Sequence, residues 1–299
     1  MNVGIIGGSG LYDLEGLASV TEETVDTPFG APSDAFVRGE LGAHTVWFLP
    51  RHGRGHRLLP SEINHRANIY AFKAFGVEQI IAFNAVGSLR EDVRPRDILL
   101  PDQYYDRTKQ SSGHTFFGDG IVGHVAFGEP ACPVLRHTIA TSIRQVLSQE
   151  NRDIRLFDGG TYVNMEGPAF STRAESNAYR AWGFDVIGMN SLPEAKLCRE
   201  AEICYQSICM ITDYDCWHEA EEAVSATLVM GHLRANTALA KRILDALIPF
   251  LPESRECSCA TALDTAVMTD PSVIPDAAMH RLAPIVKRYC EARRAGHAE

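Results

Sequence analysis

Hydrophobic residues along this chain fall into short unbroken runs, and longer amphipathic stretches separate the runs. The runs at 3–6, 45–49 and 203–211 have the length and continuity of strands that are buried on both faces. The alternation predicts an α/β/α sandwich, a single domain built around a mixed, mostly covered central sheet. The expected strands are 3–6, 45–49, 79–83, 97–100, 159–165, 185–189 and 203–211, and the expected helices are 60–75, 133–148, 173–182, 192–201, 220–251 and 280–294.

The pattern changes near residue 252. We therefore divide the chain into a main domain over 1–252 and a C-terminal extension over 253–299, which begins with the turn-rich stretch 255–279. The extension is expected to pack on the same domain or on a neighbouring subunit.

Charge and hydropathy narrow the possible partners. The 299 residues carry a formal net charge of −10, and no Lys/Arg cluster forms a basic face. Nucleic acid and anionic membranes are therefore poor partners, whereas a small anionic ligand can still bind at a local positive site. The chain has no apolar run long enough for a membrane helix, and it starts without the basic segment of a signal peptide, so we expect a cytoplasmic protein.

Eight cysteines are present. In a cytoplasmic protein reduced, buried thiols are the default. Cys257-Ser258-Cys259 is closer than the usual zinc spacing, so we expect no metal site. Disulfides remain an open alternative for Cys132, Cys198, Cys204, Cys257 and Cys259, because thermophile proteins are an exception to the redox rule.

The most informative stretch follows the strand expected at 203–211. Asp213 and Asp215 stand one residue apart where that strand ends. Ligands of open α/β sheets bind outside the carboxyl ends of strands, and two carboxylates in such a crevice can be held at different pKa values. This pair suits a heterocycle that has both N–H and ring-nitrogen sites. The ordinary alternative is a solvated loop in which Asp caps a helix.

Three further loops lie at strand ends. They are a glycine turn around Ser9, the pair Arg51-His52, and Asn84-Ala85. Backbone N–H groups and an arginine fork suit an anion such as phosphate, although each loop alone is also an ordinary turn or surface pair. The glycine turn matches neither a dinucleotide fingerprint nor a P-loop.

Taken together, these segments resemble the trimeric purine nucleoside phosphorylases, and within them the branch that cleaves 5′-methylthioadenosine. The order and spacing of the motifs carry the resemblance over residues 3 to about 250. The matching segments are Gly4 to Leu11, Asp26 to Gly30, Arg51 to Gly53, Asn84 to Leu89, Met165 to Glu175 and Thr212 to Trp217.

The resemblance implies attack of phosphate on C1′ of a methylthio-nucleoside, which releases adenine and 5-methylthioribose 1-phosphate. It implies no cofactor beyond phosphate as co-substrate, and a homotrimer or a dimer of trimers. It implies a catalytic pair of Asp213 at purine N7 and Asp215 at the 6-amino group. The other implied contacts are Ser9, Arg51, His52, Asn84, Ala85 and Asn190 for phosphate, Met189 for the sugar, Phe170 and Thr212 for the base, and His124 of a neighbouring subunit with Val224, Val229 and Met230 around the methylthio group.

Some positions depart from the family pattern. Ser9, Asn84 and Asn190 stand where the family usually has Thr, which affects phosphate affinity more than reaction type. Two alternatives remain open. A phosphorylase for inosine or methylthioinosine would want a donor such as Asn opposite the 6-oxo group, and a non-catalytic nucleoside-binding protein would not need Arg51 and His52.

Overall fold

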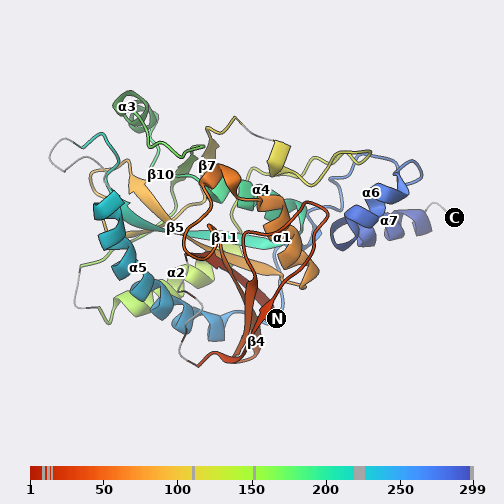
Figure 1. Cartoon of the computed structure of the whole chain (residues 1–299), viewed down its shortest axis with the longest axis horizontal. Coiled ribbons are helices and arrows are strands. Elements are labelled where there is room, and N and C mark those ends of the chain that lie inside the picture. Colours follow the sequence, from red (N-terminus) through yellow and green to blue (C-terminus); the bar gives the residue numbers. More distant parts are fainter. Residues whose placement is uncertain are drawn as a thin grey trace.

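A large mixed sheet forms the centre of the molecule. A computed structural model describes residues 1–8, 11, 14, 16–109, 112–150, 153–218 and 226–296, with the side chains at 226–231, 233, 234 and 291–296 outside the description. Within that part of the chain, eleven strands form the sheet, in the order β2-β3-β4-β1-β5-β10-β9-β7, with β11 beside β5 and β6, and β8 beside β6 (Figure 1). The strands are β1 Asn2–Gly7, β2 Ala18–Glu23, β3 Phe36–Leu41, β4 His44–Pro50, β5 Gln79–Ser88, β6 Ile98–Leu100, β7 Gln103–Asp106, β8 Leu156–Asp158, β9 Thr161–Asn164, β10 Val186–Gly188 and β11 Cys204–Asp213.

The inner strands run parallel, which brings their carboxyl ends to one edge of the sheet. β1 pairs in parallel with β4 and β5, and β5 pairs in parallel with β11. β10 runs antiparallel to the end of β5. The mixed, covered sheet expected from the sequence is therefore confirmed, and the strand ends that carry the candidate chemistry lie together.

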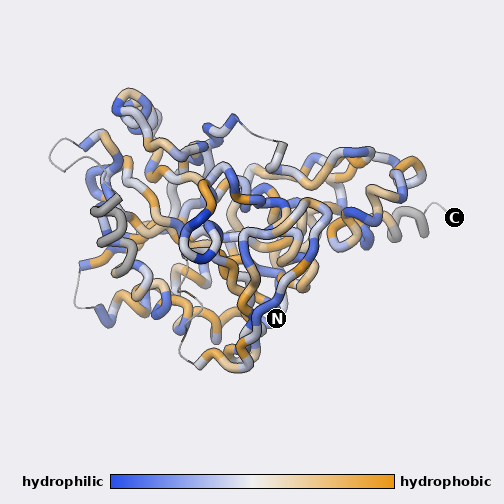
Figure 2. The backbone as a smooth tube through the Cα atoms, in the orientation of Figure 1, coloured by the Kyte–Doolittle hydropathy of each residue, from blue (hydrophilic) through white to orange (hydrophobic). Residues whose placement is uncertain are grey.

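Helices cover both faces of the sheet. Successive residues of β1 point to opposite sides, since Ile6 belongs to the core under α1 (His65–Ala74) and α4 (Ser191–Glu200). Ile5 belongs to the core under α2 (Pro133–Leu147) and α5 (Ala226–Leu247). Figure 2 shows hydrophobic stretches through the middle of the molecule and hydrophilic ones along its outer loops. Burial on both faces explains why these strands appear in the sequence as continuous apolar runs.

Several element boundaries differ from the expected ones, and each difference has a local cause. The helix expected over 60–75 begins only at His65, because Asn64 caps it and a 3₁₀ turn, Pro60–Glu62, precedes it. The strand expected over 159–165 is β9 alone, since Gly159 and Gly160 have positive φ and separate it from β8. β2 was not expected, because it is a polar, mostly exposed edge strand.

The expected C-terminal helices also differ. The helix expected over 280–294 is divided at Leu282 into α6 (Asp276–Arg281) and α7 (Ala283–Gly296). By contrast, the helix α3 (Arg173–Ala181) lies where it was expected. Residues 220–225 of the helix expected over 220–251 lie outside the described residues.

The C-terminal extension packs on the main body of the same chain. Leu282 and Val286 share a core cluster with Phe72 of α1. Arg255 Nη1 donates to the backbone carbonyls of Glu78 and Glu202, at 3.3 and 2.6 Å. The alternative, packing on a neighbouring subunit, stays a prediction. Among the described helices, none has the length and apolar character needed to cross a membrane.

Candidate active site at the strand ends

The parallel register places the first strand-end loops next to each other. Gly7 pairs with Pro50, and the Arg51 N–H donates to the Gly7 carbonyl at 3.0 Å. The structure thus brings Arg51 to the glycine turn, as the sequence predicts. Ser9, in that turn, lies outside the described residues.

Arg51 is buried and is held by a carboxylate. Its Nε and Nη2 atoms donate to the two carboxylate oxygens of Glu194 at 2.5 and 3.0 Å, and its Nη1 donates to the Phe83 carbonyl at 2.9 Å. Although burial alone would lower it, the pKa of Arg51 is raised, because Glu194 lies against the guanidinium. A guanidinium has five N–H groups, and these bonds use three of them. Two remain for a further acceptor such as phosphate oxygen.

His52 is neutral and is oriented by its neighbours. Its Nδ1 lies 2.9 Å from the Leu58 carbonyl, which can only accept, so Nδ1 carries the proton. Burial lowers the pKa of His52 to about 4. The other ring nitrogen, Nε2, therefore accepts, and Asn190 Nδ2 lies 3.3 Å from it. Two of the predicted phosphate residues are thus joined directly.

Asn84 and Ala85 lie on adjacent positions of β5 but differ in exposure. Asn84 is buried, and its Nδ2 donates to the Ser207 hydroxyl at 2.9 Å, whereas Ala85 is exposed. The Ser207 hydroxyl also accepts from Ser191, which follows Asn190 at the start of α4. The predicted phosphate residues after β4, on β5 and just before α4 are therefore linked through short polar contacts.

The two aspartates lie at the end of β11. The Thr212 hydroxyl donates to Asp213 Oδ2 at 2.6 Å, and the Asp215 N–H donates to Asp213 Oδ1 at 3.1 Å. Both carboxylates are buried. Gly87 of β5 leaves the room for them, because a Cβ there would lie 3.0 Å from Asp213 Oδ1 and 3.3 Å from the Asp215 Cβ.

Asp215 differs from Asp213 in its environment. Its Oδ2 atom is buried and has no hydrogen-bond partner of normal geometry among the described residues, although the Ser176 and Ser171 hydroxyls lie close to the carboxylate. Burial raises the pKa of Asp215. An unpaired buried carboxylate oxygen is costly, and a ligand that donates to it would remove that cost. A raised pKa favours the protonated form of a carboxyl group, which is the form that a general acid needs.

The phosphate residues and the aspartates lie at a distance that suits a nucleoside. On β5, Asn84 belongs to the first group and Gly87 contacts the second. Three residues of extended strand span about 10 Å. One ligand can therefore reach both ends of the crevice.

Met189 and Phe170, predicted to contact the sugar and the base, are less buried than the two aspartates. Gly167 approaches Met189 closely, since a Cβ at Gly167 would lie 2.5 Å from the Met189 sulfur. Met189 also lines a cavity of about 200 Å³ with His65, His114 and Glu166. Phe170 is 54% exposed, so its ring is free to cover a ligand. The cavity meets the predicted site only through Met189.

For four other predicted residues, the described part of the chain shows no contact with the site. His124 is exposed, and its N–H donates to the Ala266 carbonyl of the extension at 2.8 Å. Val224 lies outside the described residues. Val229 and Met230 lie in α5, but their side chains are outside the description.

Sequence reasoning missed two residues that shape the site. Glu194 holds Arg51, and His65 is buried beside Met189 in the cavity. Glu194 had a detectable signal: it precedes Leu197 and Cys198 by three and four positions, so it lies on the core-facing side of a helix. A carboxylate at such a position needs a cationic partner.

Comparison with known proteins agrees with this geometry. A sequence profile described as "Phosphorylase superfamily" matches residues 2–249. An S-methyl-5′-thioadenosine phosphorylase of Koribacter versatilis is 51% identical over 98% of each chain. The enzyme of that name from Geobacter sulfurreducens is 50% identical over 96% of this chain and 98% of its own.

Solved structures give the same result. A methylthioadenosine phosphorylase from an antarctic soil metagenomic library superposes with a TM-score of 0.89 at 43% identity, covering 95% of this chain and 98% of the other. The methylthioadenosine phosphorylase of Schistosoma mansoni in its apo form gives a TM-score of 0.78 at 33% identity, covering 93% and 99%.

Proposed function

Because this chain belongs to the phosphorylase superfamily, we propose that it is an S-methyl-5′-thioadenosine phosphorylase, a pentosyltransferase of purine and methionine salvage. Phosphate attacks C1′ of the nucleoside, the glycosidic bond breaks, and adenine and S-methyl-5-thioribose 1-phosphate are released. The near-full-length relatives of that name support this activity.

The observation that carries the proposal is the buried Oδ2 of Asp215, which no described residue binds with normal geometry, beside the fixed carboxylate of Asp213. Adenine offers a 6-amino donor and the N7 acceptor on one edge. We assign Asp215 Oδ2 to the amino group and Asp213, when protonated, to N7. A proton or hydrogen bond at N7 neutralises the negative charge that grows on the leaving base.

At the other end, phosphate is both nucleophile and counter-charge. The two remaining N–H groups of Arg51 orient it, and they sit on a guanidinium that Glu194 already fixes. Neutral His52 offers no donor from Nε2 in the free protein, so an arriving phosphate dianion favours its protonation. We assign Asn84, Ala85, Asn190 and Ser9 to the remaining contacts.

The assembly belongs to the proposal. We infer a homotrimer, or a dimer of trimers, in which His124 reaches the methylthio group bound by the neighbouring subunit. Its exposure and its anchoring on the extension support this role. The catalytic reaction needs no cofactor besides phosphate as co-substrate, and a cytoplasmic location stays a prediction.

One coupled assay tests the activity. Adenine release from methylthioadenosine is measured with and without phosphate, and kcat/KM is compared for methylthioadenosine, adenosine and inosine. We expect no turnover without phosphate and the order methylthioadenosine, adenosine, inosine. Adenine release without phosphate would indicate a hydrolase. Turnover of inosine as fast as that of methylthioadenosine would indicate a 6-oxopurine enzyme, and binding without turnover would indicate a sensor.

A further inference from the structure

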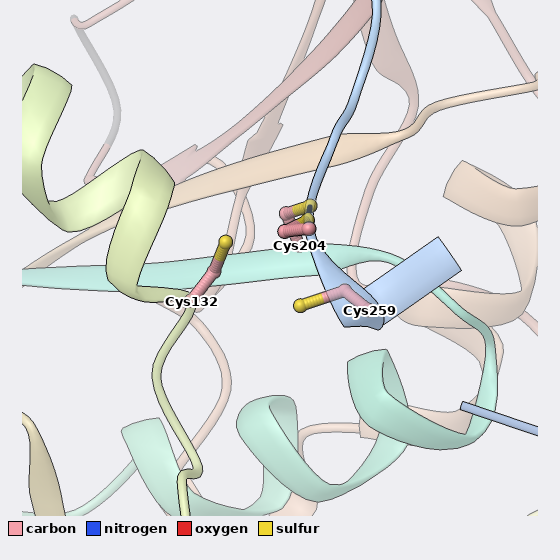
Figure 3. A group of neighbouring side chains, drawn as sticks. Cys132, Cys204 and Cys259 are labelled. Carbon is pink, nitrogen blue, oxygen red and sulfur yellow. Dashed lines mark hydrogen bonds between the residues drawn. The ribbon is translucent and has the colours of Figure 1, made fainter. Parts of the chain in front are cut away.

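Four cysteines from three segments that are distant in sequence meet near the start of β11, at the opposite end of that strand from Asp213. Cys132 caps the start of α2, Cys204 begins β11, and Cys257 and Cys259 come from the extension. Their sulfur atoms all lie within 4.8 Å of one another, and those of Cys204 and Cys257 are 3.1 Å apart. Figure 3 shows the labelled side chains of Cys132, Cys204 and Cys259 close together.

We propose that Cys132, Cys204, Cys257 and Cys259 bind one structural zinc ion that fastens the extension to the main body. A tetrahedral site with Zn–S bonds of about 2.3 Å separates its sulfur atoms by about 3.8 Å. The observed separations bracket that value. Two disulfides would require only two separate pairs of sulfur atoms. One metal ion requires all four sulfur atoms around a single centre.

The surroundings suit thiolates that bind a cation. Cys132 lies at the N-terminus of a fifteen-residue helix, and its Sγ accepts from the Leu135 N–H at 3.5 Å, where the helix dipole favours negative charge. Apolar residues of the same core cluster, such as Leu135 and Leu251, keep water away.

The short Cys257-Ser258-Cys259 spacing made a metal site unexpected from the sequence. That spacing matters less here, because two further ligands come from other elements. The backbone sets their positions firmly: the Cys132 N–H donates to the carbonyl of Tyr205, the residue after Cys204, at 3.0 Å. Leu263 N–H and Arg288 both donate to Glu202, just before β11, so the extension is tied at this corner from two sides.

Zinc content of the full chain tests the proposal. The protein, produced with zinc in the medium and purified in reductant without a metal-affinity tag, should carry about one zinc per chain by mass spectrometry. Cys132→Ser and Cys259→Ser should lose most of the zinc. Cys198→Ser is the matched control, because Cys198 is equally buried and near Cys259 but outside the cluster, and it should keep the metal.

Thiol counting separates zinc from disulfides. A second preparation, purified without reductant and denatured with chelator, should yield all eight thiols, because each disulfide would hide two of them. Cobalt(II) exchanged into the wild-type chain should give the absorption of a tetrahedral thiolate site, which needs no variant that might fold poorly. A chain without zinc overturns the proposal whatever its thiol count, and so does zinc that survives in both Cys132→Ser and Cys259→Ser.

Discussion

The two ends of the crevice handle buried charge in opposite ways. At the end that we assign to phosphate, Arg51 is already paired with Glu194 through two hydrogen bonds, and Asn84 is bound to Ser207. At the end that we assign to the base, Asp213 is held by Thr212, but Asp215 keeps a buried oxygen that no described residue binds with normal geometry.

This difference indicates at which end a bound ligand meets groups that are already in place, and at which end it completes a missing interaction. The phosphate end is preorganised, so phosphate meets groups already in place and gains orientation at little cost in rearrangement. The base end is incomplete, so a base that donates to Asp215 removes an existing penalty. Removing a group from the first end should therefore harm folding, and removing one from the second should harm chemistry and selectivity.

The largest expected effect is on stability at the phosphate end. Arg51→Met leaves the buried Glu194 carboxylate without its cation, which typically costs about 3–5 kcal/mol in the free energy of unfolding. The double variant Arg51→Met/Glu194→Gln should recover part of that loss. Chemical denaturation measures both.

Arg144→Met is the control for that experiment. Arg144 pairs with Asp158 on the surface, so its loss should cost less than about 1 kcal/mol. If Arg51→Met is as stable as Arg144→Met, the phosphate end is not held by the Arg51–Glu194 pair.

The next effect is on catalysis at the base end. Asp213→Asn should lower kcat by roughly 10²-fold, the scale of a lost general acid, with little change in stability. Asp215→Asn should instead raise relative turnover of inosine, because it replaces an acceptor for the amino group by a donor for an oxo group. Kinetics with adenine and hypoxanthine nucleosides separate the two.

The reverse result would exchange the two roles. The raised pKa of Asp215 supports that alternative, because it favours the protonated form of Asp215, which can act as the acid. In that case kcat falls in Asp215→Asn, and Asp213→Asn changes selectivity instead.

The sequence predicted much of this arrangement, and the part it missed has a physical cause. Strand-end position alone indicated Arg51, Asn84 and Asp213, because parallel strands present their carboxyl ends at one edge. It could not show that Glu194 neutralises Arg51, since a buried pair between residues 143 positions apart is decided by tertiary packing.

The same reason applies to the cysteines. Cys257 and Cys259 are close in sequence, but only the fold brings Cys132 and Cys204 to them. The polar strand β2 was missed because an exposed edge strand leaves no run of apolar residues.

A smaller effect concerns the stability of the protein in acid, through His65, which lines the cavity with Met189. Burial lowers the pKa of His65 to about 3, so the unfolded chain, with a His pKa near 6.5, binds the extra proton first as pH falls. The contribution of His65 to the free energy of unfolding is complete above pH 6.5. On acidification it is lost at up to about 1.4 kcal/mol per pH unit. Buried Glu200, whose pKa is raised to about 7, acts in the opposite direction, so wild type alone is ambiguous.

The difference between wild type and His65→Gln isolates the histidine. The free energy of unfolding of wild type should fall relative to that of the variant between pH 6.5 and 4, because Gln takes up no proton. Parallel pH curves for the two proteins would mean that His65 is already protonated or exposed in the folded chain.

The smallest expected effect lies outside both ends, at the site we assign to the neighbouring subunit. His124→Ala should raise KM for methylthioadenosine about fivefold, the scale of one lost contact of about 1 kcal/mol, and leave kcat nearly unchanged. His137→Ala, an exposed histidine on α2, is the matched control and should change neither. Sedimentation of both variants should give about three times the 32.9 kDa chain mass, because each change removes only an exposed side chain. An active monomer would remove the shared site and confine the whole reaction to the Arg51 and Asp213 ends of one chain.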